Sequence, residues 1–430
     1  MKVFSLMNVL VCSFCLVSAL SSPRQASEPG RRVRREIRDL TESERLALFE
    51  AMWEMRNLST KEGQEKYGSA FRTWDYLVAK HAVAAEDPSG DQGHYGPCFI
   101  TYHRALMLET ENILLSINPE FKALPYWDLT LDAGHGGRYR EGDDEYIFSD
   151  TYLGSYTGNE EMDYAVTDGA FAYWPVTKFD KKEYGLLQHI YSGSSTTGYN
   201  RRGSNELDSP YLTRFPKGTL SYTNYEMDET IEGTKEDNDI CSSFDYVADI
   251  EHFVNCVDAE DVSNEVDGPP AGFYYKDGEK KTVRFIHSQA HLKIGSRSTL
   301  GVNGDFRDAA TSINDPFFLF HHTNIDRLFM QWQMSALNAD SDQDASDVMY
   351  GFPTHPPSKQ ETDLGFTVYD VCWEIDNTIS PNFPFYENDL FGEGNDAHST
   401  SGKGKTYTNR DILRFTGPGN SIYTYDTTMW

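Results

Sequence analysis

Apolar side chains recur at intervals of three and four in several stretches of this 430-residue chain, a spacing typical of amphipathic helices. The first stretch covers residues 40–55, where Thr41 and Glu44 have the spacing of a capping box ahead of the apolar run. Another helix is predicted after Asp315-Pro316, because Asp is a favourable N-cap and Pro a favourable first helical residue. Further helices are predicted across 65–85, 101–117 and 283–295.

The rest of the chain has no long helical period and no internal repeat. Residues 130–280 are rich in Gly, Ser, Tyr and Asp, and residues 336–430 offer only short strand candidates such as SIYTYD. Both regions are predicted to form extended loops and short strands over a helical core. The predicted fold class is therefore mainly α, with long loops and a few short strands.

The N-terminus has the pattern of a removable secretory signal, with one lysine, an apolar core and small residues, over residues 1–21. Residues 22–35 are predicted to be a propeptide or linker, because the arginines of RRVRRE suit a processing protease that cuts after Arg35. A basic, solvated linker is the alternative interpretation of this run. A secreted protein with one domain over residues 36–430 is expected.

The chain carries a formal net charge of −29, which repels nucleic acid and anionic membranes. Beyond the N-terminus, no apolar run approaches the roughly 18 residues that a membrane helix needs. We therefore expect neither nucleic acid nor a membrane as a partner, and the oligomeric state stays open.

Four cysteines lie outside the predicted signal, and in a secreted protein they are expected to form one or two disulfides. Three pairings are open among them, and the pair Cys241 and Cys256 is favoured. No CxxC motif occurs, which argues against a cysteine zinc site.

Histidines gather in the predicted helices, where an uncompensated imidazole needs hydrogen-bond partners or a metal ion. His287 and His291 are four residues apart, which places both on one helix face. The doublet of His321 and His322 offers a third ligand from another helix.

A second group lies upstream, where His94 and His103 flank the start of a predicted helix. His81 follows Leu77 by four residues on the inward face of the preceding helix. Two sites of three neutral imidazoles suit copper, zinc or iron, and spacing alone does not choose between them.

These motifs, taken in order, resemble the type 3 dicopper proteins, which are tyrosinases, catechol oxidases and molluscan haemocyanins. The resemblance rests on HYGPCFITYHR followed by LPYWD, on HSQAH followed by NDPFFLFHHTNID, and on the closing TNRDILRFTGPGNSIYTYD. It covers nearly the whole chain after residue 35. It implies an antiparallel four-helix bundle that holds two copper ions, within a single tyrosinase-type catalytic domain over residues 36–430.

The resemblance also implies roles for individual residues. It assigns hydrogen-bonding support to His321, packing beside the metal to Phe318, and orientation of a ligand-bearing helix to Asp326. Copper A would be held by His81, His94 and His103, and copper B by His287, His291 and His322.

The implied function is oxidation of catechols and monophenols to o-quinones with O2 as co-substrate. The substrates would be phenolic small molecules or the tyrosyl and dopa side chains of proteins. Family members with strong phenol hydroxylation often have asparagine after the first copper B histidine, whereas this chain has Ser288. We therefore expect catechol oxidation more than hydroxylation.

Cys98 follows His94, whereas the cysteine that forms a thioether with a copper A histidine in some relatives precedes the second ligand. We expect no thioether of that type and no ligand role for Cys98. Three alternatives stay open at this point: an oxygen carrier like haemocyanin, a matrix protein with an idle site, and zinc in place of copper.

Overall fold

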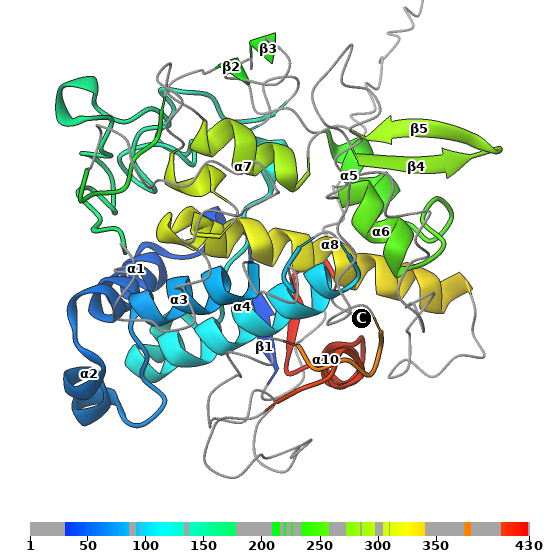
Figure 1. The fold of residues 1–430 in the computed structure, drawn as a ribbon, viewed down its shortest axis with the longest axis horizontal. Helices are drawn as coiled ribbons and strands as arrows, with labels where there is room; N and C mark the ends of the chain where they lie inside the picture. The colour runs from blue at the N-terminus through cyan, green and yellow to red at the C-terminus, as the bar shows by residue number, and fades with distance from the viewer. Residues whose placement is uncertain are drawn as a thin grey trace, which may run out of the picture.

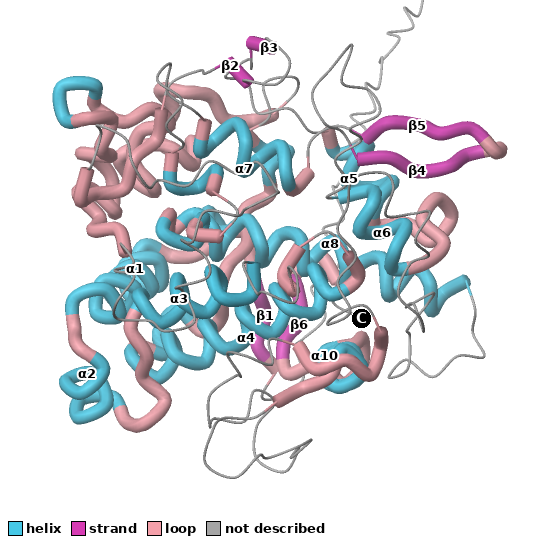
Figure 2. The backbone as a smooth tube through the Cα atoms, in the orientation of Figure 1, coloured by secondary structure: helices cyan, strands magenta, loops and turns pink. Residues whose placement is uncertain are grey.

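Helices make up most of the regular structure in the computed structural model of the chain (Figures 1 and 2). The structure describes residues 31–85, 92–94, 96–132, 137–177, 209–215, 219–220, 225–226, 234–257, 272–283, 286–296, 304–308, 310–339, 374–379 and 406–428. The α-helices are α1 (Glu42–Asn57), α2 (Thr60–Tyr67), α3 (Trp74–Ala85), α4 (Cys98–Ile117), α5 (Lys235–Cys241), α6 (Ile250–Val257), α7 (Ser288–Gly295), α8 (Phe317–Ala339) and α10 (Asn409–Thr416). The mainly helical fold class predicted from the sequence is confirmed.

The strands are short and form two-stranded sheets. β2 (Thr219–Leu220) pairs with β3 (Tyr225–Glu226), and β4 (Gly272–Lys276) forms an antiparallel hairpin with β5 (Glu279–Val283). β1 (Arg32–Arg34) pairs in parallel with β6 (Tyr423–Tyr425), so the two ends of the described chain lie side by side (Figure 2).

The capping box predicted for α1 is confirmed. The backbone N–H of Glu44 donates to the Thr41 hydroxyl at 3.3 Å, and the Glu44 carboxylate accepts the Thr41 backbone N–H at 2.9 Å. These bonds satisfy donors that a helix start otherwise leaves unpaired, so the helix begins at this position.

The single helix predicted across residues 65–85 is wrong, because the chain breaks between α2 and α3. Gly68 follows Tyr67 with a φ of 94°, a left-handed conformation that glycine adopts without strain. The apolar spacing of Phe71 and Leu77 therefore reflects burial of two separate segments rather than one helix face. His81 keeps its predicted inward direction on α3 and is fully buried.

Gly68→Ala is expected to lower the free energy of unfolding by about 1 kcal/mol or more, because alanine is strained at this φ. A Cβ at this position would meet no atom within 4 Å, so the loss would come from the backbone alone. Chemical denaturation measures the change, and an unchanged midpoint would show that the turn can adopt another conformation.

The start of α8 agrees with the predicted Asp-Pro signal. The Asp315 carboxylate accepts the backbone N–H of Phe317 at 3.0 Å. Arg214 donates to both oxygens of the same carboxylate at 2.9 Å. This buried ion pair fixes the first turn of the helix that carries the histidine doublet.

Residues 31–35 belong to the folded unit and do not form a fully solvated run in this structure. Arg34 is fully buried, and its guanidinium donates to Glu111 at 2.7 Å and to Asp326 at 3.1 Å. The same group lies 3.6 Å from the centre of the Tyr423 ring. Cleavage after Arg35 stays a prediction, and it would separate this strand from the chain.

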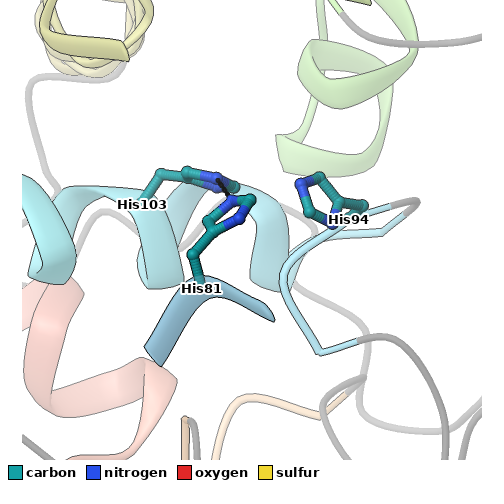
Figure 3. A group of neighbouring side chains, drawn as sticks. All are labelled: His81, His94 and His103. Carbon is teal, nitrogen blue, oxygen red and sulfur yellow. Dashed lines mark hydrogen bonds between the residues drawn. The ribbon is translucent and has the colours of Figure 1, made fainter. Parts of the chain in front are cut away.

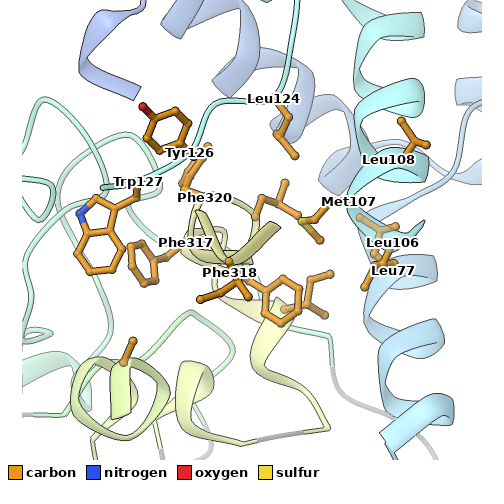
Figure 4. Close-up of a cluster of buried hydrophobic side chains, with 14 of the residues drawn as sticks. Leu77, Leu106, Met107, Leu108, Leu124, Tyr126, Trp127, Phe317, Phe318 and Phe320 are labelled. Atoms are coloured by element: carbon orange, nitrogen blue, oxygen red, sulfur yellow. The ribbon is translucent and has the colours of Figure 1, made fainter. Parts of the chain in front are cut away.

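The histidine-bearing helices pack around one apolar core (Figure 4). α8 contacts α4, and the core between them includes Phe318 and Phe320 of α8 with Leu106 of α4. α3 is joined to α4 by the buried ion pair of Lys80 and Glu109, at 2.8 Å. Among the described residues, no helix combines the length and apolar character needed to cross a bilayer.

The favoured disulfide between Cys241 and Cys256 is confirmed, with Cα atoms 5.6 Å apart. It joins α5 to α6, two short helices that the sequence patterns do not predict. Cys98 is also disulfide-bonded, which agrees with the expectation that it has no ligand role.

Candidate metal centre

The upstream histidines meet at one point, although they come from three places in the chain (Figure 3). His81 leaves α3, His103 leaves α4, and His94 lies in the segment that leads into α4. Their ring nitrogens lie within 4.8 Å of one another. The structure therefore brings together the three residues that the motif assigns to copper A.

Hydrogen bonds to carbonyl groups fix which nitrogen of two rings carries the proton. Nδ1 of His81 donates to the Ala310 carbonyl at 3.0 Å, and Nδ1 of His103 donates to the Phe99 carbonyl at 2.9 Å. A carbonyl only accepts, so each Nδ1 carries the proton and each Nε2 offers a lone pair.

These two lone pairs face each other, with Nε2 of His81 and Nε2 of His103 only 3.2 Å apart. Two acceptors at this distance repel each other unless a cation lies between them. A metal ion bound at about 2.0–2.1 Å in tetrahedral geometry separates its nitrogen ligands by about 3.3 Å. The arrangement of the first triad thus fits a metal ion.

The downstream histidines form an even tighter group. Nε2 of His322 lies 3.4 Å from Nε2 of His287 and 3.2 Å from Nε2 of His291, and the last two are 3.2 Å apart. Nδ1 of His291 donates to the Phe306 carbonyl at 2.8 Å, which again leaves Nε2 as the lone-pair nitrogen. The three distances match the nitrogen triangle of one tetrahedral ion.

His321 also approaches this second centre. Its ring nitrogens group with those of His287 and His291 within 4.8 Å, a looser set than the triangle made with His322. The shorter distances favour His322 as the third ligand. The hydrogen-bonding role expected for His321 stays a prediction, because the His287 carbonyl raises the pKa of this ring but neither ring nitrogen has a partner at ordinary hydrogen-bond geometry.

Burial keeps these imidazoles neutral. It lowers the pKa of His81 from its ordinary value to about 3, with a smaller contribution from the neighbouring His94. Burial also lowers the pKa of five further rings well below the usual range, at His103, His287, His291, His321 and His322. A neutral imidazole is the form that binds metal, so the site is ready to bind at neutral pH.

The two triads lie against each other. The rings of His103 and His322 stack with centroids 4.2 Å apart and planes 12° apart. One side chain from each triad is therefore in direct contact, which places the two candidate ions in one dinuclear centre.

Phe318 packs between the triads, one turn before His322 on α8. Its ring centroid lies 4.0 Å from that of His322 and 5.0 Å from that of His81. Phe99 has the same position relative to His103 on α4, and its ring lies 4.9 Å from His103 and 4.5 Å from His287. The motif did not single out Phe99, although its spacing of four before a histidine repeats that of Phe318.

Asp326, one turn after His322, joins several elements rather than touching a histidine. Its carboxylate accepts hydrogen bonds from Arg104, which follows His103 on α4, and from Arg34 of β1. Tyr423 and Tyr425 of β6 donate to it at 2.7 and 2.6 Å. Burial would raise the pKa of Asp326, but the two guanidiniums outweigh it and hold the pKa below its usual value.

The contacts of Asp326 fix α8 to α4 beside the ligands of both triads. This position agrees with an orienting role for Asp326, exerted through Arg104 rather than through a ligand. Ser288 is the first residue of α7, and its side chain lies outside the described part of the chain.

Comparison with known proteins agrees with the motifs. The family model described as the common central domain of tyrosinase matches residues 71–335, more than half of the chain. A tyrosinase of Aspergillus oryzae is 27% identical over 345 residues, which cover 72% of this chain and 61% of that protein. A 5,6-dihydroxyindole-2-carboxylic acid oxidase of Carassius auratus is 26% identical over 262 residues, 60% of this chain and 42% of that protein.

The chain thus spans less than two thirds of the length of these two relatives. A solved polyphenol oxidase of Thermothelomyces thermophila superimposes with a TM-score of 0.48 at 19% identity, covering 92% of this chain and 88% of that one. This superposition is loose, so the assignment rests on the sequence match to the central domain. By that match, the chain belongs to the tyrosinase family.

Proposed function

We propose that this chain is a secreted dicopper oxidase that uses O2 to convert catechols, and less readily monophenols, to o-quinones. Copper A would be held by His81, His94 and His103, and copper B by His287, His291 and His322. One observation carries the proposal: two groups of three histidines bring their ring nitrogens together, with the Nε2 atoms of five rings at ligand spacing, and the two groups touch each other.

A copper pair bound there would supply two-electron chemistry with O2, one electron from each ion. The chain itself fixes the Nε2 atoms by hydrogen bonds at Nδ1 and keeps the rings uncharged. Phe99 and Phe318 cover the histidines with apolar surface, which excludes water and competing ligands. Overall, two catechols and one O2 would give two o-quinones and two waters.

The enzyme is favoured over an oxygen carrier by the names of the matched relatives, which are tyrosinases and oxidases. The names of these relatives support phenolic compounds as the substrate class. Within that class, we propose phenolic small molecules or the tyrosyl and dopa side chains of proteins. Secretion is supported by the Cys241–Cys256 disulfide, since disulfides persist in oxidising compartments. Asn57, in the acceptor sequence NLS, is exposed at the end of α1 and open to a glycan.

An oxygen electrode tests the proposal on the copper-loaded full chain. Addition of a catechol should consume one O2 for every two quinones that absorbance records. Reversible O2 uptake without quinone would instead identify an oxygen carrier, and copper binding with neither result would identify an idle site.

Ser288→Asn is expected to raise the ratio of monophenol turnover to catechol turnover several-fold. The longer amide can orient a water that accepts the phenol proton better than a hydroxyl can. Initial rates with a matched pair, such as tyrosine and dopa, measure the ratio. Ser288→Ala is the control and should lower or preserve it, whereas an unchanged ratio in Ser288→Asn would place the control of hydroxylation elsewhere.

A further inference from the structure

His321 is a buried polar side chain whose contacts the proposed ligand set does not explain. It has no exposed surface, and neither ring nitrogen makes a hydrogen bond. An imidazole in this state costs free energy, because the hydrogen bonds it had with water are not replaced. A polar ring kept under these conditions next to a metal centre needs a partner.

The ring lies as close to the second centre as a ligand does. Its centroid is 5.4 Å from that of His287, 5.3 Å from that of His291 and 5.4 Å from that of His322. The three rings of the tight triangle are separated by 4.7, 4.8 and 5.4 Å. All four imidazoles therefore surround one small region.

The neighbours of His321 on its other side are aromatic rings. Phe306, Phe317 and Trp127 have ring centroids 5.7, 5.9 and 6.1 Å away. The indole N–H of Trp127 donates to Asp132 at 2.6 Å, so it is already paired. The carbonyl of His287 raises the pKa of His321, but it already receives the N–H groups of Ala290 and His291, and neither ring nitrogen of His321 has a partner at ordinary hydrogen-bond geometry.

The doublet also differs from the other ligands in how its rings are held. His81, His103 and His291 are each anchored by a hydrogen bond from Nδ1 to a backbone carbonyl. Nδ1 of His322 has no such bond, and His321 has none at either nitrogen. The two rings of the doublet therefore lack the hydrogen bond that sets the orientation of the anchored ligands.

We propose that the second centre has two alternative third ligands. An ion held by His287 and His291 is completed by His322 in the working arrangement, and by His321 in a holding arrangement. Because His322 stacks on His103 whereas His321 packs on Phe306 and Phe317, the holding position lies on the side away from the first triad. The inference rests on the proposed function, since it takes the ion to be copper.

The number of copper ions bound per chain, measured on full-length variants in which a histidine is replaced by phenylalanine, tests the inference. Each protein is dialysed to equilibrium against buffered copper(II), and bound copper is measured by atomic absorption across a range of free copper concentrations. His322→Phe should still bind two ions, the second with about 10- to 100-fold lower affinity, the range seen when support of a ligand is lost. His321→Phe should bind two ions, and the double variant only one.

His103→Phe serves as the matched control. Its chain neighbours are Tyr102 and Arg104, which offer no imidazole, so it should bind one ion at any copper concentration that keeps the fold. For the His321 and His322 variants, circular dichroism and retention of the first-centre ion check folding. His322→Leu repeats the test where phenylalanine does not fit.

The outcomes separate the two proposals. A His322→Phe chain that binds one ion, as the double variant does, overturns the inference and leaves the proposed function intact. A wild-type chain that binds fewer than two copper ions overturns the proposed function, and the inference with it.

Discussion

His103→Phe is expected to reduce bound copper from two ions to one per chain and to lower catechol oxidation by at least about a thousandfold, the scale of loss when a catalytic unit is broken. The phenyl ring keeps the volume of the fully enclosed side chain but removes the Nε2 lone pair that faces His81. The substitution also replaces the imidazole that stacks on His322, where the two centres meet, by a phenyl ring. Copper analysis and initial rates with catechol measure the two effects.

His252→Phe is the matched control, because this histidine lies on α6 and pairs with Asp249 at 2.7 Å, with 41% of its side chain exposed. It should keep both copper ions and the rate of the parent chain. A His103→Phe protein that retains two ions and full activity would contradict the ligand assignment of the first triad.

The second large effect is expected at Arg34, on stability. Arg34→Met should lower the free energy of unfolding by about 3–5 kcal/mol, the usual loss when one partner of a buried ion pair is removed. The carboxylates of Glu111 and Asp326 would lose the guanidinium that lies between them, and Tyr423 would lose its stacked cation. Urea denaturation at neutral pH measures the difference.

Arg35→Met offers a control one residue away. Arg35 is partly exposed, and its partner Glu44 also binds Lys122, so the loss should be about 1 kcal/mol or less. An equal loss of unfolding free energy in the two variants would show that the burial of Arg34 does not make its ion pairs more stabilising than those of Arg35. A chain that starts at residue 36 should be destabilised more than one that starts at residue 31, which tests the same strand without a substitution.

The sequence predicts α1 and most of the helices that carry histidine, because their signals are local. A capping box marks α1, an Asp-Pro pair marks α8, and apolar spacing marks α4. Local signals do not predict the break between α2 and α3, since the apolar side chains on both sides of Gly68 continue at helical spacing. The conformation of one glycine, rather than the pattern, ends the helix there.

Three short helices are missed for a related reason. α5, α6 and α10 span only seven or eight residues, too few for a hydrophobic period to stand out. Thr234 with Asp237, and Thr408 with Asp411, form capping boxes that use Asp in place of the Glu or Gln of the usual pattern. A search that admits Asp at this position would find both helix starts.

The role of residues 31–35 depends on distant partners, which a single sequence does not reveal. The spacing of arginines in RRVRRE is compatible with a solvated linker, and only the parallel pairing with β6 buries Arg34 against Glu111 and Asp326. By contrast, the candidate site can be predicted from the sequence, because the histidine spacing within each motif and the order of the motifs along the chain are both properties of the sequence itself. The contacts that bring the triads together, through Phe99, Phe318 and Asp326, come from packing between helices.

Activity as a function of bound copper tests the central claim most directly. Metal-free full-length protein is given from zero to three equivalents of copper, and catechol oxidation is followed by O2 uptake at each step. If the two triads form one dinuclear centre, the rate should depend on the fraction of chains that hold both ions and reach its plateau at two equivalents. Full activity at one equivalent, or no catechol oxidation at two bound equivalents, would contradict the proposed dicopper oxidase.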